Sequence, residues 1–214
     1  MPALIEIFNS SGSVMIGSDW RNFGFRNKFS ATVTAYYTSP PNTPGFNGTT
    51  YNFAVAGTPA LLVACKASAL HPIKLNSYYS GGVWTFNWLF VIPGLDTTTE
   101  AVEFYIFDVM EGTTSNVGLE IFTEAGERAY HSDFPVMKVG AVQGCNADFV
   151  GIAGRSYVPL ILRNPVFGSA SRLWSWTLRA IGNQILTSNR QVGAAASLLG
   201  SNVGRFMAVD VTGL

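Results

Sequence analysis

Acidic side chains are the residues of this chain that could do chemistry as a group, because nine of its thirteen carboxylates fall between Asp96 and Asp133. Two carboxylates that face one sugar are the machinery of most glycoside hydrolases, and clustered carboxylates also bind Ca²⁺. Calcium loops place Asp and Asn at alternate positions around a turn glycine, and the string DTTTEAVE at 96–103 does not. A solvated acidic face is the simpler interpretation, and the two catalytic or metal-binding ones stay open beside it.

Charge is segregated along the chain. Residues 96–133 hold nine acids and one base, Arg128, for a formal charge of minus eight, whereas residues 155–214 hold six arginines and one aspartate, for plus five. Such stretches indicate faces that meet within the fold or between identical subunits. We expect a homo-oligomer whose interface uses two residues of each sign: Glu100, Glu103, Arg172 and Arg179.

The other reactive residue types are few and scattered. The two histidines, His71 and His131, have no cysteine or second histidine at metal-ligand spacing, and the sequence contains no G-x-S-x-G, H-E-x-x-H or P-loop string. Cys65 and Cys145 could form at most one bridge, and we expect both to be buried as small hydrophobic residues. We therefore expect no enzyme activity, no metal and no cofactor.

Aromatic residues make up 13% of the chain and could form either a core or a contact surface. Trp84, Phe86 and Trp88 have the period-two spacing that sends side chains to one face of a sheet, which favours a core. An aromatic face that stacks on sugars or anchors a subunit interface is the functional alternative. Six aromatic residues beside turn-rich segments are better candidates for exposed contact: Tyr36, Tyr37, Phe46, Tyr51, Tyr78 and Tyr79.

Composition restricts the class of protein. The 214 residues are 48% hydrophobic and only 12% charged, with a net charge of zero, so the basic footprint of a nucleic-acid-binding protein is missing. The N-terminal MPALIEIF does not match a secretory signal, and the longest apolar runs are interrupted by Pro59 and Pro93, which argues against a membrane span. A surface poor in charge favours an assembly protein.

The elements that must position these residues are strands. Short runs rich in Val, Ile, Phe, Tyr and Thr alternate with Gly, Pro, Asn and Ser clusters, which predicts an all-β fold of antiparallel sandwiches. The segment Thr38 to Thr50, with three prolines and two glycines, should be an exposed loop. At most one short helix is expected, within Asn183 to Gly204.

One segment occurs twice. Residues 5–20, IEIFNSSGSVMIGSDW, align without gaps to residues 119–134, LEIFTEAGERAYHSDF, at an offset of 114 and with six identities in sixteen positions. The pattern predicts two β-hairpins with the same backbone shape, with Gly12 and Gly126 in their turns. Asp19 and Asp133 should end the second strands in turns that bond their own backbone.

A fainter similarity pairs AVAGTPALLVACKAS at 54–68 with GIAGRSYVPLILRNP at 151–165, each a glycine turn followed by an apolar strand that ends in a basic residue. Together the two similarities predict related β-rich halves, 1–112 and 113–214. A single continuous domain built from duplicated hairpins would produce the same pattern.

The repeated segment resembles small tail proteins of bacteriophages. The likeness lies in the pattern EIF, three residues, glycine and a strand to Ser-Asp, which occurs near the N-terminus and again after a strand ending FYIFD. The likeness covers roughly the first 40 residues and residues 100–140, and its motifs are hairpin patterns without catalytic content. It implies a structural component of the virion tail tip or fibre that is made in the bacterial cytoplasm and contacts other tail proteins. The threefold axes of phage fibres favour a trimer.

Contact with a glycan or protein of the host surface would follow from the same resemblance. Two alternatives remain beside it: a carbohydrate-binding adhesin module, and a glycan hydrolase that uses the acidic stretch.

Overall fold

The structure is a computed structural model that describes residues 6–8, 14–17, 22–36, 48–92, 96–109, 118–132, 135–163, 166–169, 172–193 and 204–214. For residues 6–8, 14–17, 166–169, 172–173 and 191–193 only the backbone is described. Every regular element in this part of the chain is a β-strand, so the expected all-β fold of antiparallel sheets is confirmed. In the segment considered for at most one short helix, Gln184–Gly193 forms a strand that pairs along its length with the strand before it, and residues 194–203 lie outside the described residues.

The first half of the chain forms two three-stranded sheets. Its six strands are β3 (Phe23–Ala35), β4 (Thr49–Ala56), β5 (Leu62–Lys66), β6 (His71–Ser80), β7 (Val83–Val91) and β8 (Thr98–Val109). The sheet orders are β3-β8-β5 and β4-β7-β6, so the first strand pairs with the last and the second with the fifth. This nested antiparallel winding is that of a jelly roll reduced to six strands.

The second half repeats this winding. Its strands are β11 (Lys138–Gly144), β12 (Phe149–Val150), β13 (Tyr157–Arg163), β14 (Val166–Ser169), β15 (Arg172–Ile181), β16 (Gln184–Gly193) and β17 (Arg205–Asp210). The sheet orders β11-β17-β13 and β12-β16-β15-β14 reproduce those of the first half, with β14 as an added edge strand. The two halves are therefore two copies of one topology.

A hairpin precedes each sandwich. The first is β1 (Glu6–Phe8) with β2 (Val14–Gly17), and the second is β9 (Glu120–Phe122) with β10 (Arg128–His131). Glu6 pairs with Gly17 as Glu120 pairs with His131, and the register shifts at the same step in both hairpins, so the predicted common register is confirmed. Gly126 has the expected positive φ of 78° in its turn, whereas Gly12, Asp19 and Asp133 lie outside the described residues.

The repeat continues past the hairpins into the sandwiches. A β-bulge interrupts β3 between Phe25 and Asn27, with Arg26 as the extra residue. A second bulge interrupts β11 between Val139 and Ala141, with Gly140 as the extra residue, and Gly140 is again 114 residues after Arg26. Bulges bend an edge strand and fix its register, so each sandwich uses the same device at the same place.

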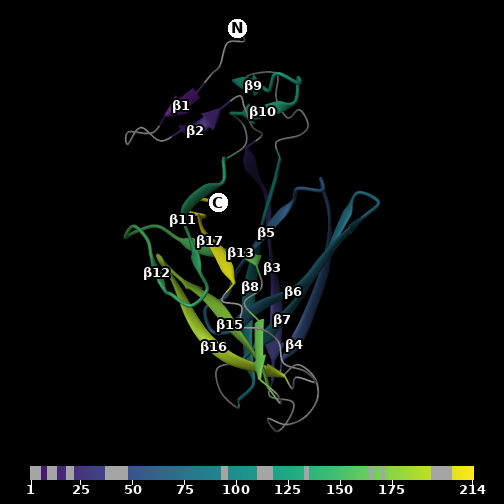
Figure 1. Ribbon diagram of the computed structural model, residues 1–214, viewed down its shortest axis with the longest axis vertical. Coiled ribbons are helices and arrows are strands. Elements are labelled where there is room, and N and C mark those ends of the chain that lie inside the picture. Colours follow the sequence, from purple (N-terminus) through teal and green to yellow (C-terminus); the bar gives the residue numbers. More distant parts are fainter. Residues whose placement is uncertain are drawn as a thin grey trace.

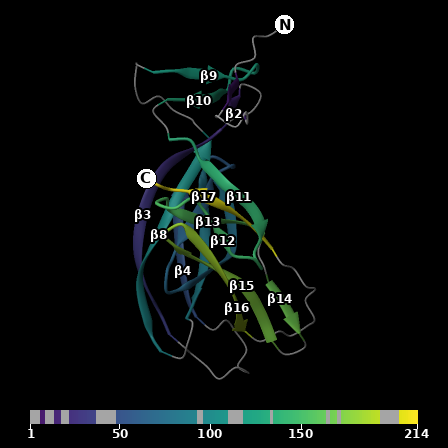
Figure 2. The ribbon, with the colours of Figure 1, turned by 90° about the vertical axis from the view of Figure 1, so that its left-hand side faces the viewer.

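The two copies face each other around a local pseudo-two-fold axis. The Met137 amide donates to the Phe23 carbonyl at 2.8 Å, and these residues are themselves 114 positions apart. Further contacts between the halves join equivalent strands: β2 with β10, β5 with β13 and β6 with β15. Both hairpins lie at the same end of the molecule (Figures 1 and 2). The chain thus has the isologous packing of a two-fold dimer within one polypeptide.

The core is continuous across the two halves. One buried cluster joins Phe86, Trp88 and Phe104 of the first half to Leu178 and Phe206 of the second. Phe104 lies at its centre, within 4.7–6.4 Å of five other ring centroids: those of Phe29, Tyr51, Phe53, Trp88 and Phe90. The core interpretation of the Trp84 to Trp88 stripe is confirmed for Phe86 and Trp88, which are fully buried.

Candidate functional site

Each sandwich opens at the edge where its first and second strands lie beside each other. A pocket of about 470 Å³ lies there in the first half, between β3 and β4, and is lined by residues such as Arg26, Phe29 and Phe53. A second pocket of about 470 Å³ lies at the equivalent edge of the second half and includes Gly140, Phe149 and Tyr157 in its lining. Because the two pockets occupy equivalent places, their differences show what the second copy has gained or lost.

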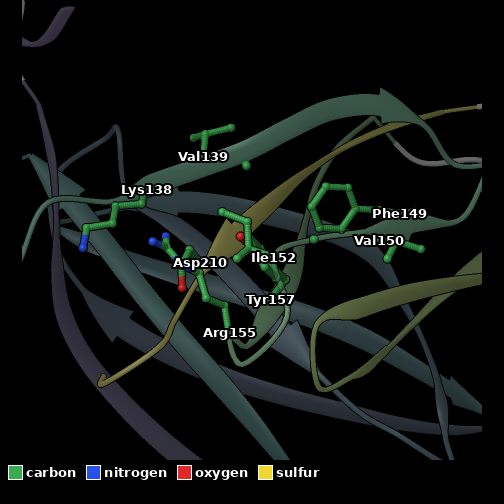
Figure 3. A pocket seen from close by; sticks show the side chains of 10 residues that line it. Lys138, Val139, Phe149, Val150, Ile152, Arg155, Tyr157 and Asp210 are labelled. Carbon is green, nitrogen blue, oxygen red and sulfur yellow. The ribbon is translucent and has the colours of Figure 1, made fainter. Parts of the chain in front are cut away.

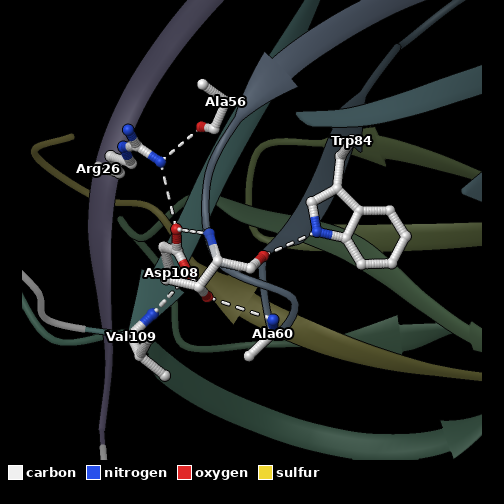
Figure 4. Close-up of polar contacts among 7 residues, drawn as sticks. Arg26, Ala56, Ala60, Trp84, Asp108 and Val109 are labelled. Carbon is white, nitrogen blue, oxygen red and sulfur yellow. Dashed lines mark hydrogen bonds and ion pairs between the residues drawn. The ribbon is translucent and has the colours of Figure 1, made fainter. Parts of the chain in front are cut away.

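In the first half this edge is tied down by a buried carboxylate, Asp108, at the end of β8 (Figure 4). The Thr58 amide donates to Asp108 at 3.0 Å, and the Thr58 hydroxyl donates to its other oxygen. The Arg26 guanidinium lies 3.2 Å from Asp108 and donates to the Ala56 carbonyl at 2.6 Å. Trp84 donates its indole N–H to the Thr58 carbonyl at 2.8 Å, so the loop between β4 and β5 is held from both sides.

In the second half the equivalent carboxylate is Asp210 at the end of β17. Lys138 pairs with it across the ladder as Gly24 pairs with Asp108. Arg155, from the loop before β13, donates to Asp210 at 2.7 Å, and the Thr212 amide donates at 3.0 Å. Burial raises the pKa of Asp210, but the hydrogen bonds from Thr212 and Arg155 outweigh burial and hold this pKa below its ordinary value. The carboxylate is therefore ionised and fully engaged.

The two edges differ in what stands at the bulge. Arg26 covers the first edge, whereas Gly140 in its place leaves room for the ring of Tyr157, which would lie 2.8 Å from a Cβ at residue 140. Figure 3 shows Val139 and Ile152 beside Tyr157, with Phe149 next to them and the Lys138 side chain extending away. Val139, Val150 and Ile152 are all exposed, so the second edge presents an apolar surface.

Three of the exposed aliphatic residues can be matched by strand register to residues of the first half. Val142 corresponds to Lys28, because they pair with Met207 and Tyr105 at equivalent ladder positions. Val150 corresponds to Ala56 and Ile181 to Ser80, because each pairs with the first residue after the equivalent hairpin turn. Val142, Val150 and Ile181 are 55%, 67% and 44% exposed. Exposed aliphatic groups thus replace a lysine, an alanine and a serine.

The faces of the β8 and β17 sheets that carry Glu103 and Arg205 pack against each other in their middle, and they differ in charge at the ends where these two residues lie. In the first half, Lys66 lies 2.9 Å from Glu103, its cross-strand partner, and Tyr105 donates its hydroxyl to the same carboxylate at 2.9 Å. Burial raises the pKa of Glu103, but the hydrogen bonds from Lys66 and Tyr105 outweigh it and leave the pKa lowered. In the second half the equivalent pair is Arg163 opposite Arg205. Like charges directly opposite each other destabilise a ladder.

The four residues expected at a charged interface have different roles. Glu100 accepts hydrogen bonds from the amides of Ser68, Ala69 and Leu70, so it caps the turn before β6. Glu103 is neutralised by Lys66, as described above. Arg179 donates to the Ser68 carbonyl at 3.2 Å, and the side chain of Arg172 lies outside the described residues. Glu100, Glu103 and Arg179 thus each make a contact within the chain, and the expected charged interface stays a prediction.

The aromatic residues expected at the surface divide into three groups. Tyr36, Tyr78 and Tyr79 are exposed, and Tyr79 packs on Trp84 with their ring centroids 5.4 Å apart near the tip of the β6–β7 hairpin. Tyr51 is half-buried and stacks on Phe104, because alternation along β4 turns it inward, so its expected exposure is wrong. Tyr37 and Phe46 lie outside the described residues.

The histidines and cysteines are buried. His71 has no exposed surface, and its Nδ1 lies 2.8 Å from the Thr177 hydroxyl, which itself donates to the Ser188 carbonyl. His71 therefore carries its proton on Nδ1 and donates it. Burial first, and then Arg190 and Arg179, lower the pKa of His71 to about 3. His131 lies 3.2 Å from Glu120, which also binds Arg128. Cys65 and Cys145 are both free and buried, as expected.

No protein-family profile, no curated protein and no solved structure matches the chain. In the described ranges, no helix has the length and hydropathy to cross a membrane, and no group of three or more His, Cys, Asp or Glu residues could hold a metal ion. Asp210 is the one carboxylate that lines either of the two edge pockets.

Proposed function

We propose that this chain is a non-enzymatic structural subunit of a bacteriophage tail, located at the tail tip or in a fibre. The observation that carries the proposal is the difference between the two sandwiches, because the second presents exposed Val142, Val150 and Ile181 where the first presents Lys28, Ala56 and Ser80. Exposed aliphatic residues grouped on one copy of a duplicated fold are typical of an assembly surface. The resemblance of the repeated hairpin to phage tail proteins gives the surface its context.

The internal chemistry supports a structural role. The carboxylates at the ends of β8 and β17, Asp108 and Asp210, hold loops in place, and Glu100 caps a turn. Glycoside hydrolysis needs two carboxyl groups on one sugar site, and each edge pocket offers one carboxylate or none. The subunit would fold in the bacterial cytoplasm and join other tail proteins through the second sandwich.

The test is electron microscopy of purified phage particles with a gold label on the chain. We expect label at the tail, and chain that is present in the lysate but missing from purified particles would contradict the proposal. Val150→Lys should reduce incorporation into particles, because it places a charge on the apolar edge. Ala56→Lys is the matched control, because it makes the same change at the equivalent exposed position of the first half.

A carbohydrate-binding module is the second candidate, favoured by the tip of the β6–β7 hairpin. Tyr78 and Tyr79 are 58% and 38% exposed there, and the Tyr79 ring packs on Trp84. Exposed aromatic rings stack on sugars and anchor interfaces. A glycan array probed with the isolated chain tests this candidate: binding that Tyr78→Ala abolishes and Tyr36→Ala spares would favour it, and no binding to any glycan would contradict it.

A further inference from the structure

One end of the β11-β17-β13 sheet carries two exposed cations for which the described residues provide no ion pair, whereas the middle of the same sheet face is packed against the first half. Arg163 and Arg205 are cross-strand partners, and both are exposed. Their equivalents in the first half, Lys66 and Glu103, form an ion pair at 2.9 Å. The first half therefore shows how this position is neutralised when the sandwich is complete in itself: a carboxylate on the last strand faces a cation on the third.

The strands of the second sandwich have no such carboxylate beside these arginines. The sequence contains no aspartate or glutamate from residue 149 to residue 209, a stretch that holds six arginines. Asp210 is bound by Arg155, and Asp148 accepts from the Thr187 amide at 2.7 Å and from its hydroxyl at 2.8 Å. Within the described residues, Arg163 and Arg205 are therefore open to a carboxylate of a partner. Val142 and Leu162, which are 55% and 48% exposed on β11 and β13, add apolar surface on these same edge strands.

The chain carries a surface of complementary chemistry on its second hairpin. Glu124 is exposed in the turn between β9 and β10. Leu119 and Phe122, on the same hairpin, are 52% and 48% exposed. This combination of an acid with two large apolar groups is complementary to the exposed end of β11-β17-β13, which has two arginines beside Val142 and Leu162.

The two surfaces are separated within one molecule. The β9–β10 hairpin lies at one end of the fold, whereas β17 lies in the body of the molecule (Figure 1). A contact between the two surfaces therefore joins one molecule to the next.

We propose that the exposed end of the β11-β17-β13 sheet at Arg163 and Arg205 binds the acidic β9–β10 hairpin of a second copy of this chain. The inference rests on the proposed structural function and deepens it by naming the partner. Arg163 and Arg205 receive the Glu124 carboxylate, because guanidinium groups bind carboxylates through paired hydrogen bonds. Phe122 and Leu119 cover Val142 and Leu162. The contact joins different surfaces, so it is heterologous and builds a closed ring or a filament.

Sedimentation velocity of the whole chain over a range of concentrations tests the contact. The wild type should self-associate, and both Glu124→Arg and the double variant Arg163→Glu with Arg205→Glu should weaken association by tenfold or more. The triple variant that combines all three substitutions swaps the charges across the contact and should restore association. Raising the salt concentration should weaken the wild-type assembly, because exposed ion pairs are screened over about 10 Å at 0.1 M salt.

Lys138→Glu is the matched control, because it reverses an exposed cation at the other end of the same sheet. It should leave association unchanged, and a thermal melt of each variant identifies any that fails to fold. A wild type that stays monomeric, an assembly that ignores the Arg163 and Arg205 reversals, failure of the triple variant to reassociate, or an equal loss in Lys138→Glu would each overturn the proposal. The gold label on purified particles is independent of these outcomes, so the proposed tail function stands or fails separately.

Discussion

The two halves of the molecule share a winding and differ in their surfaces. The positions they share are those on which the fold depends: the bulges at Arg26 and Gly140, and the strand-end carboxylates Asp108 and Asp210. Each half also has a fully buried phenylalanine four residues before this carboxylate, Phe104 in one and Phe206 in the other. Buried and backbone-determined positions tolerate little change, whereas exposed positions can take a new function.

The difference between the surfaces indicates a division of roles. The first half pairs Lys66 with Glu103 and covers its edge bulge with Arg26. Charged residues on edge strands are among the devices that prevent unwanted pairing. The second half keeps the bulge but has Gly140 in place of the arginine, and it exposes Val142 and the facing arginines Arg163 and Arg205. We infer that the first half stabilises the fold and that the second half makes contacts.

The largest loss of stability is expected from replacing the two equivalent core phenylalanines, Phe104 and Phe206. Phe104→Ala and Phe206→Ala each remove a fully buried ring and should destabilise the chain by about 3–5 kcal/mol. Phe104→Ala should cost more, because five rings surround Phe104 and each aromatic pair contributes about 0.5–1.5 kcal/mol beyond burial. Urea denaturation measures both variants, and a larger loss in Phe206→Ala would contradict this view of the core.

A smaller effect is expected at two glycines that open the loop after the second strand. The Gly57 amide donates to the Gly82 carbonyl as the Gly151 amide donates to the Asn183 carbonyl, so the two glycines are equivalent. A Cβ at Gly151 would meet three atoms of the rigid Tyr157 ring, whereas one at Gly57 would meet chiefly the flexible end of Leu61. Gly151→Ala should therefore destabilise by about 1–3 kcal/mol, and Gly57→Ala by less. Thermal unfolding of the two variants side by side measures the difference.

The glycines also show how far the sequence alone could lead. The hairpin repeat was predictable because its turn, strands and register are determined by neighbouring residues, and the offset of 114 holds from β1 to the bulge at Gly140. The fainter similarity aligned Gly57 with Gly154, but the structure matches Gly57 to Gly151, because the loop before β13 is longer than the loop before β5. Unequal loops reduce the offset to 102 between Asp108 and Asp210, which hides the shared winding from a gapless comparison.

The candidate site was harder to predict than the fold. Charge segregation was visible in the sequence, but it could not show that Glu100 caps a turn, that Glu103 pairs with Lys66 or that Arg179 bonds a carbonyl. Which charges remain for a partner depends on cross-strand register, and register depends on contacts between residues far apart in the chain. The facing of Arg163 and Arg205 is such a long-range result.

A pH titration sharpens the comparison of the strand-end carboxylates. The pKa of Asp210 is lower in the folded chain than its ordinary value, so the folded state favours the ionised form. Its stabilising effect is present above the ordinary pKa of an aspartate, about 3.9, and is lost as the pH falls through the lower folded value. At pH 7, Asp210→Asn should have a lower urea midpoint than the wild type. Below pH 3 the difference between the two midpoints should shrink, because the wild-type carboxyl group is then protonated. A midpoint difference that does not change with pH would contradict an ionised role for Asp210.

The smallest effect is expected from exchanging the charges of two equivalent cross-strand pairs, Lys66 with Glu103 and Arg163 with Arg205. Arg205→Glu places a carboxylate opposite Arg163, as Glu103 lies opposite Lys66, and should stabilise the monomer by about 0.2–1 kcal/mol. Glu103→Arg makes the reverse change and should destabilise the chain by a similar amount or more, because Tyr105 also loses its acceptor. The same Arg205→Glu substitution should weaken self-association, so stability and assembly change in opposite directions. An Arg205→Glu variant that loses both monomer stability and self-association would show that Arg205 serves the fold and not the contact. A residue that serves only a partner can be replaced without destabilising the isolated subunit.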